Sequence, residues 1–283
     1  MTPPIFALLT DFGLEDEYVG VVKAVLLSHL PRAQIFDLCH AVPPQDIATG
    51  ALILARGLPY LPPACFVIAV IDPGVGGKRR LLATRLDGRW YLAPDNGLLT
   101  PVLRQNPEQV MVLHPPDELL SKASATFHGR DILAPMAVNL ATRLALGGTP
   151  ADLGETIATG ECCFLPEPLL RKDDGCIQGK IIHIDHFGNL ISNICRDDLS
   201  KTLVAAACMV TVGGAEIRGI SEAYHEKTSG EMLALWDSQN HLEIAVSGGS
   251  AAKVLGVGKK MTVEIRWLAA GEAFSIDGSG GNL

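Results

Sequence analysis

Short apolar runs alternate with helical patterns over the first half of the chain. Strands are predicted where apolar residues follow one another, at 5–9, 34–39, 66–71 and 110–113. Helices are predicted where apolar residues recur at helical spacing, at 18–30, 47–58, 97–103 and 132–146. Residues 81–92 predict a hairpin centred on Asp87-Gly88. Strands that alternate with helices indicate a three-layer α/β domain over residues 1–165, in which helices cover a mostly parallel sheet.

The pattern changes after residue 165. Pro166 and Pro168 lie in a predicted linker, and short β-rich runs follow at 180–184, 190–194, 209–212, 232–236, 241–246 and 261–267. Glycine-rich or polar turns separate several of these runs, which is typical of antiparallel strands. We therefore expect a second, smaller domain over residues 175–283, built as an antiparallel barrel or sandwich.

The composition narrows the class of partner. Lys and Arg number 23 against 31 Asp and Glu, which gives a net charge of −8. Nucleic acids and anionic membranes bind basic surfaces, so we expect neither as a partner. No apolar run reaches the ~18–20 residues of a membrane helix, and the N-terminus lacks the pattern of a secretory signal. Seven cysteines without a CxxC pair favour a reducing cytosol over disulfides or zinc. We expect a cytoplasmic protein with a small-molecule partner.

Three segments lie where a parallel α/β sheet binds ligands, beyond the carboxyl ends of its strands. Asp11 follows the first strand, and its carboxylate could accept both hydroxyls of a ribose or only satisfy a turn. Asp72 follows the run 66–71 and begins a glycine turn that leads to the cations Lys78, Arg79 and Arg80. An Asp–Arg pair across this turn could hold a water molecule or form a structural ion pair, and the turn lacks the GxxxxGK[ST] pattern of a phosphate loop. His128 precedes the longest helix, and its role depends on whether it meets Asp72 in space.

A fourth segment, 183–189, lies in the second half of the chain. Two histidines and an aspartate suggest a metal by their spacing, but His183 and His186 face opposite sides of a strand. We therefore expect no metal site there. Phe187 and Asn189 could instead stack on and hydrogen-bond a purine base.

Several motifs occur in one order along nearly the whole chain. They are TDFG at 10–13 with DEYVG at 16–20, DPGVGG at 72–77 with Arg79, PDNGLLT at 94–100, FHGRD at 127–131, DHFGNLISN at 185–193 and DSQNHLEIAV at 237–246. In this combination the chain resembles the adenosine-forming S-adenosyl-L-methionine (SAM) hydrolases, also called SAM hydroxide adenosyltransferases. These enzymes are relatives of the fluorinase and chlorinase, which attack SAM with a halide.

The resemblance implies a fold, an assembly and a set of site residues. It implies an N-terminal α/β domain, a C-terminal β-barrel, and a homotrimer with each active site between the N-terminal domain of one subunit and the C-terminal domain of its neighbour. It implies that Asp72, Arg79 and His128 position and activate water. The substrate-binding positions that it implies are Asp11 for the ribose, Phe127 and Gly129 beside the catalytic histidine, and, around the adenine and the amino-acid part, Asp185, Phe187, Asn189, Ser238 and the backbone near Gly248.

Differences from the halogenases bear on the nucleophile. The halogenases carry a tyrosine where this chain has Asp72, and the fluorinase carries a serine where it has Gly129, so water is favoured over a halide. A fluorinase arginine that holds the substrate carboxylate falls on Gln239. The expected reaction is SAM + H₂O → adenosine + L-methionine by attack at C5′, with no metal and no redox cofactor. The resemblance leaves open whether hydroxide or late-deprotonated water attacks. Two rival functions are a SAM- or adenosine-binding sensor with negligible turnover and a halide-using transferase.

Overall fold

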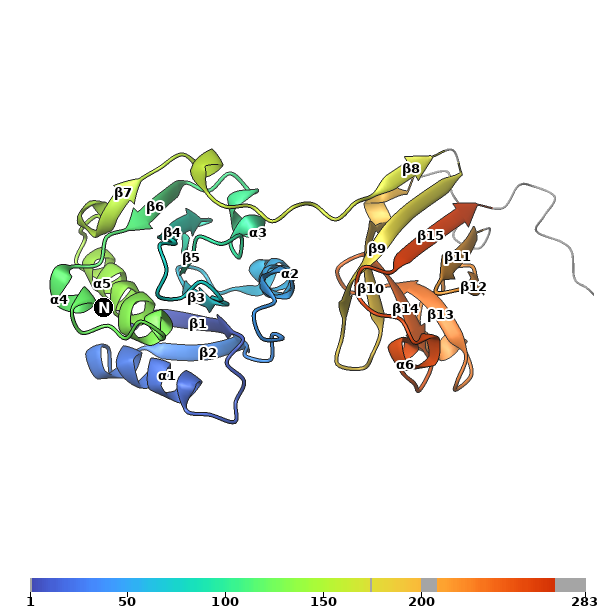
Figure 1. Ribbon diagram of the computed structural model, residues 1–283, viewed down its shortest axis with the longest axis horizontal. Coiled ribbons are helices and arrows are strands. Elements are labelled where there is room, and N and C mark those ends of the chain that lie inside the picture. Colours follow the sequence, from blue (N-terminus) through green and yellow to red (C-terminus); the bar gives the residue numbers. More distant parts are fainter. Residues whose placement is uncertain (1, 174, 200–207, 268–283) are drawn as a thin grey trace, which may run out of the picture. The chain divides into compact units, whose positions relative to one another are not determined.

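The computed structural model describes residues 2–173, 175–199 and 208–267. Contacts divide the chain into two compact units, Met1–Pro166 and Glu167–Leu283 (Figure 1). Within the second unit, β8 (Arg171–Asp173) pairs with β9 (Cys176–Ile184), so part of the predicted linker belongs to a sheet. Residues 268–283 of the predicted second domain lie outside the described residues.

The N-terminal unit is built on a seven-stranded sheet. Its strands, in the order in which they pair, are β2 (Gln34–Cys39), β1 (Ile5–Thr10), β3 (Phe66–Val70), β5 (Arg89–Pro94), β4 (Leu81–Leu86), β6 (Gln109–Leu113) and β7 (Gly154–Thr156). The pairings from β2 to β5 are parallel and those from β5 to β7 are antiparallel, so the sheet is mixed. The reversal follows from the predicted hairpin, which is confirmed: Asp87 and Gly88 both have positive φ, 50° and 71°, as a two-residue hairpin turn requires.

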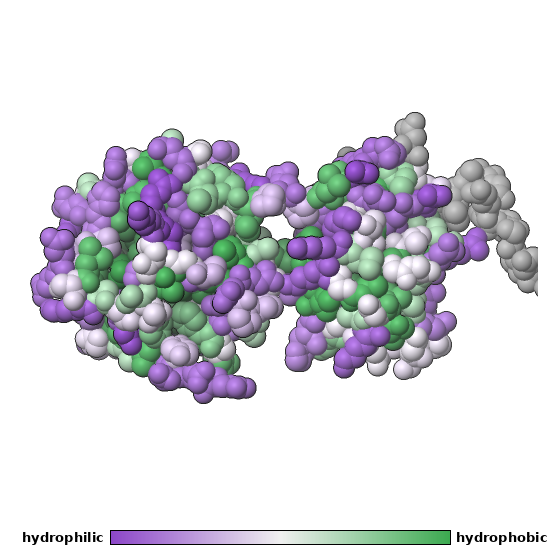
Figure 2. Space-filling view, viewed as in Figure 1, coloured by the Kyte–Doolittle hydropathy of each residue, from purple (hydrophilic) through white to green (hydrophobic). Residues whose placement is uncertain are grey.

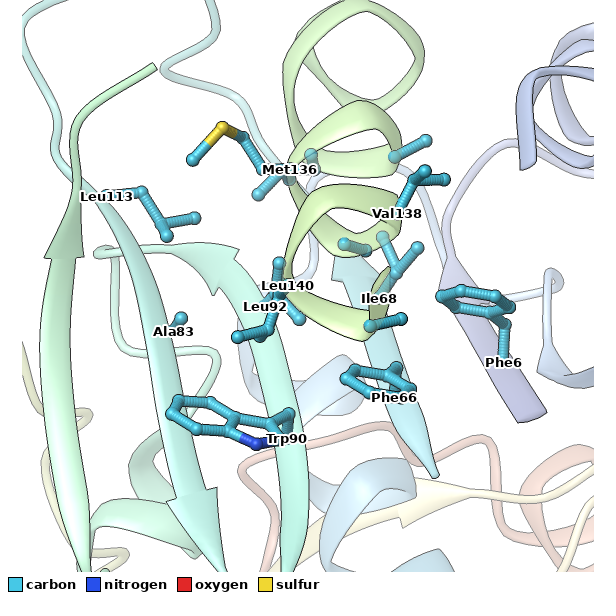
Figure 3. Close-up of a cluster of buried hydrophobic side chains, with 14 of the residues drawn as sticks. Phe6, Phe66, Ile68, Ala83, Trp90, Leu92, Leu113, Met136, Val138 and Leu140 are labelled. Atoms are coloured by element: carbon cyan, nitrogen blue, oxygen red, sulfur yellow. The ribbon is translucent and has the colours of Figure 1, made fainter. Parts of the chain in front are cut away.

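Helices cover both faces of this sheet, which confirms the α/β class. They are α1 (Tyr18–His29), α2 (Ile47–Gly57), α3 (Thr100–Leu103), α4 (Asp117–Leu120) and α5 (Ala134–Ala145). Alternate residues of a strand point to opposite faces. Phe6 and Leu8 of β1 therefore pack with α1 and α5, whereas Ala7 and Leu9 pack with α2 and α3. Figure 3 shows the first of these two cores, with side chains of α5 over the strands.

The predicted helix over 132–146 begins within a π-helical turn. Gly129–Leu133 form a π-helical turn, and α5 follows from Ala134 with Pro135 in its first turn, where proline is tolerated. Among the described residues, no helix combines the length and apolar character needed to cross a membrane. Hydrophilic and hydrophobic side chains are interspersed over the face of each unit that Figure 2 shows.

The second unit is a nearly closed antiparallel barrel, so the barrel is confirmed over the sandwich. Its strands, in the order in which they pair, are β12 (Ala215–Arg218), β11 (Cys208–Val212), β15 (Thr262–Trp267), β9, β10 (Leu190–Cys195), β14 (His241–Val246) and β13 (Met232–Trp236). Ser221, just after β12, bridges to Leu235 of β13, so the two ends of this order meet. Apolar side chains from alternate positions fill the interior. A short helix, α6 (Ala251–Leu255), follows β14.

Candidate active site

Two aspartates, Asp11 and Asp72, line one cavity at the carboxyl edge of the N-terminal sheet. β1 pairs with β3 in parallel, with Thr10 opposite Val70, so the residues that follow these strands emerge at the same edge. A cavity of about 220 Å³ opens there. It is lined by Asp11, Phe12, Gln45, Val70, Asp72, Pro73, Val75, Thr126, Phe127, His128 and Gly129. The structure thus brings together the three N-terminal segments that the sequence singled out.

Asp72, Arg79 and His128 form one hydrogen-bonded chain. The Arg79 Nε lies 2.9 Å from both carboxylate oxygens of Asp72, and its Nη2 also donates to Oδ2. The same Nη2 donates to His128 Nδ1 at 2.9 Å. The Asp72 and Arg79 side chains are only 5% and 11% exposed, so little water screens the pair. Asp72 and His128 come from segments far apart in the sequence, and Arg79 fixes their relative positions by hydrogen-bonding both.

This chain of contacts sets the protonation of His128. A guanidinium only donates hydrogen bonds, so Nδ1 must accept, and the proton of the neutral ring sits on Nε2. Burial, and after it the positive charge of Arg79, lower the pKa of His128 from its ordinary value. His128 is therefore neutral near pH 7 and offers an N–H donor from Nε2.

A buried network positions the Asp11 turn. Thr10 Oγ1 lies 2.7 Å from Nδ1 of the buried His40 and accepts the Phe12 N–H at 3.2 Å. His40 Nε2 in turn lies 3.0 Å from an Asp37 oxygen. Asp11 Oδ2 accepts the Gln45 N–H at 2.7 Å. Sequence analysis did not single out His40 or Gln45, and no local motif marks either one.

Aromatic rings form one wall of the cavity. Phe12 and Phe127 line the cavity, and Tyr18 packs against both, with the three ring centroids 5.4–6.0 Å apart. The Arg130 guanidinium lies 4.8 Å from the Phe127 centroid. A Cβ at Gly129 would lie 3.4 Å from both methyl groups of Val70. A larger side chain at Gly129 would therefore crowd the space beside His128.

The PDNGLLT motif contacts the backbone that leads into Asp72. The Asn96 side chain donates to the carbonyl of Ile71 at 2.8 Å and accepts the Leu98 N–H at 3.1 Å. Asp95 is buried and accepts hydrogen bonds from Arg80 and from the Cys163 N–H. The Asn96 contact fixes the backbone immediately before Asp72, which gives this motif a structural role.

In the second unit, Asp185 organises a tight loop between β9 and β10. Its Oδ1 accepts the N–H groups of Phe187 and Asn189, both at 2.9 Å, and its Oδ2 accepts the Asn189 side chain at 3.0 Å. Phe187 is 73% exposed. Gly188 has φ +86°, and a Cβ there would overlap the Ser250 hydroxyl at the start of α6. The loop is thus seated against the segment that contains Gly248.

Ser238 belongs to a different loop of the second unit. It is in the exposed turn before β14, whereas Gly248 follows that strand, so the two flank β14 at opposite ends. The turn is held by Asp237, whose Oδ1 accepts the N–H groups of Gln239 at 2.8 Å and His241 at 2.9 Å. Within the residues that the structure describes, no group of three or more His, Cys, Asp and Glu side chains is placed to hold a metal ion.

Known proteins resemble the chain over both units. A model of the SAM hydroxide adenosyltransferase N-terminal domain matches residues 6–152, and a model of the C-terminal domain matches residues 179–264. A Thermus thermophilus protein named (R)-S-adenosyl-L-methionine hydrolase is 39% identical over 274 residues, covering 94% of this chain and 100% of that protein. A Nocardia brasiliensis protein named fluorinase is 30% identical, covering 70% and 73%.

A solved structure shows the same arrangement of elements. The crystal structure of an uncharacterized conserved protein from Thermotoga maritima matches with a TM-score of 0.82 at 31% identity, covering 92% of this chain and 99% of that one. The two domain models lie in the order that the motifs predict and together span most of both units. This chain belongs to the SAM hydroxide adenosyltransferase family.

Proposed function

We propose that the chain hydrolyses SAM to adenosine and L-methionine. The observation that carries the proposal is the Asp72–Arg79–His128 chain at a cavity that Asp11 also lines. Hydrolase relatives that are 36–39% identical over most of the chain support the same reaction. Their name specifies the (R) form, and the sulfonium sulfur is a stereocentre because it bears three different carbon groups. We therefore propose the (R)-sulfonium epimer as the preferred substrate.

The reaction requires a nucleophile in line with the C5′–S bond. The oxygen of water bonds to C5′ while the C5′–S electron pair moves to sulfur, which leaves as the neutral thioether of methionine. No acid is needed at sulfur. For well-oriented groups, positioning alone can lower the activation free energy by up to ~7–11 kcal/mol. Catalysis can therefore depend mainly on holding water and C5′ at the correct distance and angle.

The three catalytic residues have different roles in the activation of water. Because Arg79 occupies Nδ1 of His128, the neutral ring donates from Nε2 and orients the water oxygen. The proton of water passes to the Asp72 carboxylate and from there to solvent. Arg79 holds both groups and stabilises the negative charge that develops near them. A positioned base typically raises the reaction rate ~10²–10⁴-fold.

The remaining site residues bind the substrate in this proposal. Asp11 holds the ribose hydroxyls, and Phe127 and Gly129 shape the space around C5′. Asp185, Phe187, Asn189, Ser238 and the backbone near Gly248 surround the adenine and the amino-acid part. These two sets belong to different units, which supports a homotrimer whose sites join the N-terminal unit of one subunit to the second unit of its neighbour. Seven free cysteines support a cytoplasmic location.

The test is hydrolysis in water enriched in heavy oxygen, without halide, with products identified by mass spectrometry. Adenosine that carries the heavy oxygen at O5′, together with methionine, is the expected result. Separate assays on the (R) and (S) epimers give the stereochemical preference. Intact SAM recovered in a bound state would refute hydrolysis and favour a sensor. A 5′-halogenated nucleoside formed only when chloride or fluoride is added would favour a halide-using transferase.

A further inference from the structure

Gln45 lines the catalytic cavity, and the proposed mechanism does not use it. It lies in the loop between β2 and α2 and shares the cavity with Asp11 and Asp72. Its neighbour Asp46 caps α2 by accepting the Thr49 N–H at 2.9 Å and the Thr49 hydroxyl at 2.8 Å. The loop is therefore anchored where it enters the helix, and the position of Gln45 is well defined.

The backbone of Gln45 is in a conformation that favours glycine. Its φ is +66°, in the left-handed region that residues with a Cβ rarely adopt. The Gln45 N–H donates to Asp11 Oδ2 at 2.7 Å, but a glycine would make the same bond without strain. Backbone strain of this kind is concentrated at functional sites. The hydrogen bond to Asp11 therefore leaves the identity of the side chain unexplained, and the carboxamide can bind a ligand in the cavity.

The Gln45 carboxamide has the chemistry to complete a ribose site. Gln45 is exposed where it lines the cavity, and its carboxamide offers both donors and an acceptor. Ribose hydroxyls also both donate and accept, whereas the Asp11 carboxylate only accepts. We propose that Gln45 is a second ribose-recognising residue, whose carboxamide hydrogen-bonds one hydroxyl of the nucleoside that Asp11 holds. The inference rests on the proposed function, because it takes SAM as the substrate.

Two variants distinguish the effect of the Gln45 carboxamide from the effect of the strained backbone. Gln45→Gly removes both, and Gln45→Ala removes the carboxamide but keeps the unfavourable φ. Both should lower kcat/KM for SAM by ~3–10-fold, mainly through KM, as expected for one neutral hydrogen bond. Only Gln45→Gly should raise the Tm of the N-terminal unit, by about 2–4 °C. Ala64→Gly is the matched control, because Ala64 also has a positive φ, 55°, but precedes β3 at the opposite edge of the sheet. It should raise Tm and leave kcat/KM unchanged.

Substrate analogues then identify the contact. The loss caused by Gln45→Gly should disappear with either 2′-deoxyadenosyl or 3′-deoxyadenosyl methionine, because the hydroxyl that the carboxamide binds is then missing. An unchanged kcat/KM in Gln45→Gly, or an equal loss with SAM and both analogues, would overturn the proposal. If the parent chain made no adenosine, the proposed function would fail separately. The same comparison made with dissociation constants would then decide the role of Gln45.

Discussion

Removal of the Arg79 guanidinium should strongly destabilise the N-terminal unit. Arg79→Ala leaves the Asp72 carboxylate, which is 5% exposed, without its counter-charge. Breaking a buried ion pair by removing one partner costs ~3–5 kcal/mol. A change of 1 kcal/mol shifts Tm by ~2–4 °C in a domain of this size. The Tm of the N-terminal unit should therefore fall by about 6–20 °C in Arg79→Ala.

A double-mutant cycle isolates the pair itself. Asp72→Ala with Arg79→Ala removes both charges and should destabilise less than the two single changes added together. We expect a coupling of at least ~2 kcal/mol, measured by calorimetry without substrate. The reference cycle is Glu118 with Lys122, which are 84% and 72% exposed and should couple by less than ~0.5 kcal/mol. If the changes at Asp72 and Arg79 were additive within ~0.5 kcal/mol, Arg79 would not hold Asp72 and the proposed geometry would be wrong.

Two further predictions concern the other functional loops. The folded state lowers the pKa of His128, first by burial and then through Arg79, so the unfolded chain takes up this proton first as the pH falls. The stability of the N-terminal unit should drop below about pH 6.5, and the drop should be smaller in His128→Gln; denaturant midpoints measured at several pH values check this. Gly188→Ala should lower the Tm of the second unit and weaken SAM binding, because its Cβ would overlap Ser250. Gly230→Ala is the control, with a similar φ of +91° but open space around it; equal losses in both variants would contradict the packing argument.

The local elements could be predicted from the sequence because their signals are local. Apolar spacing places α1 and α2 within one residue of their ends. The hairpin of β4 and β5 was predicted, but the antiparallel pairings of β6 with β4 and of β7 with β6 could not be, because apolar patterning does not say which strands pair. The π-helical turn before α5 and the short strand β12 are too brief to leave a periodic signal.

For the candidate site too, residues with a local signal could be predicted, whereas contacts between distant segments could not. The rule for parallel sheets selects Asp11 and Asp72 from sequence alone, since each directly follows a strand. The contact between Arg79 and His128 joins residues 49 positions apart, and only the family resemblance indicated it in advance. Gln45 gave no signal at all, because a positive φ at a residue other than glycine depends on the surrounding fold rather than on the local sequence.

The separate hydrophobic cores of the two units have a consequence for how this family can diverge. Asp72, Arg79 and His128 all belong to the N-terminal unit, while the loop at Asp185 is built on the barrel. Substitutions that alter the attacking species therefore need not disturb the fold of the unit that carries the Asp185 loop. In the proposed site, a lineage can exchange water for a halide by changing a few cavity residues while it keeps unaltered the barrel loop that is proposed to surround the adenine and the amino-acid part. Chimaeras that join the N-terminal unit of one relative to the barrel of another offer protein engineers the same route.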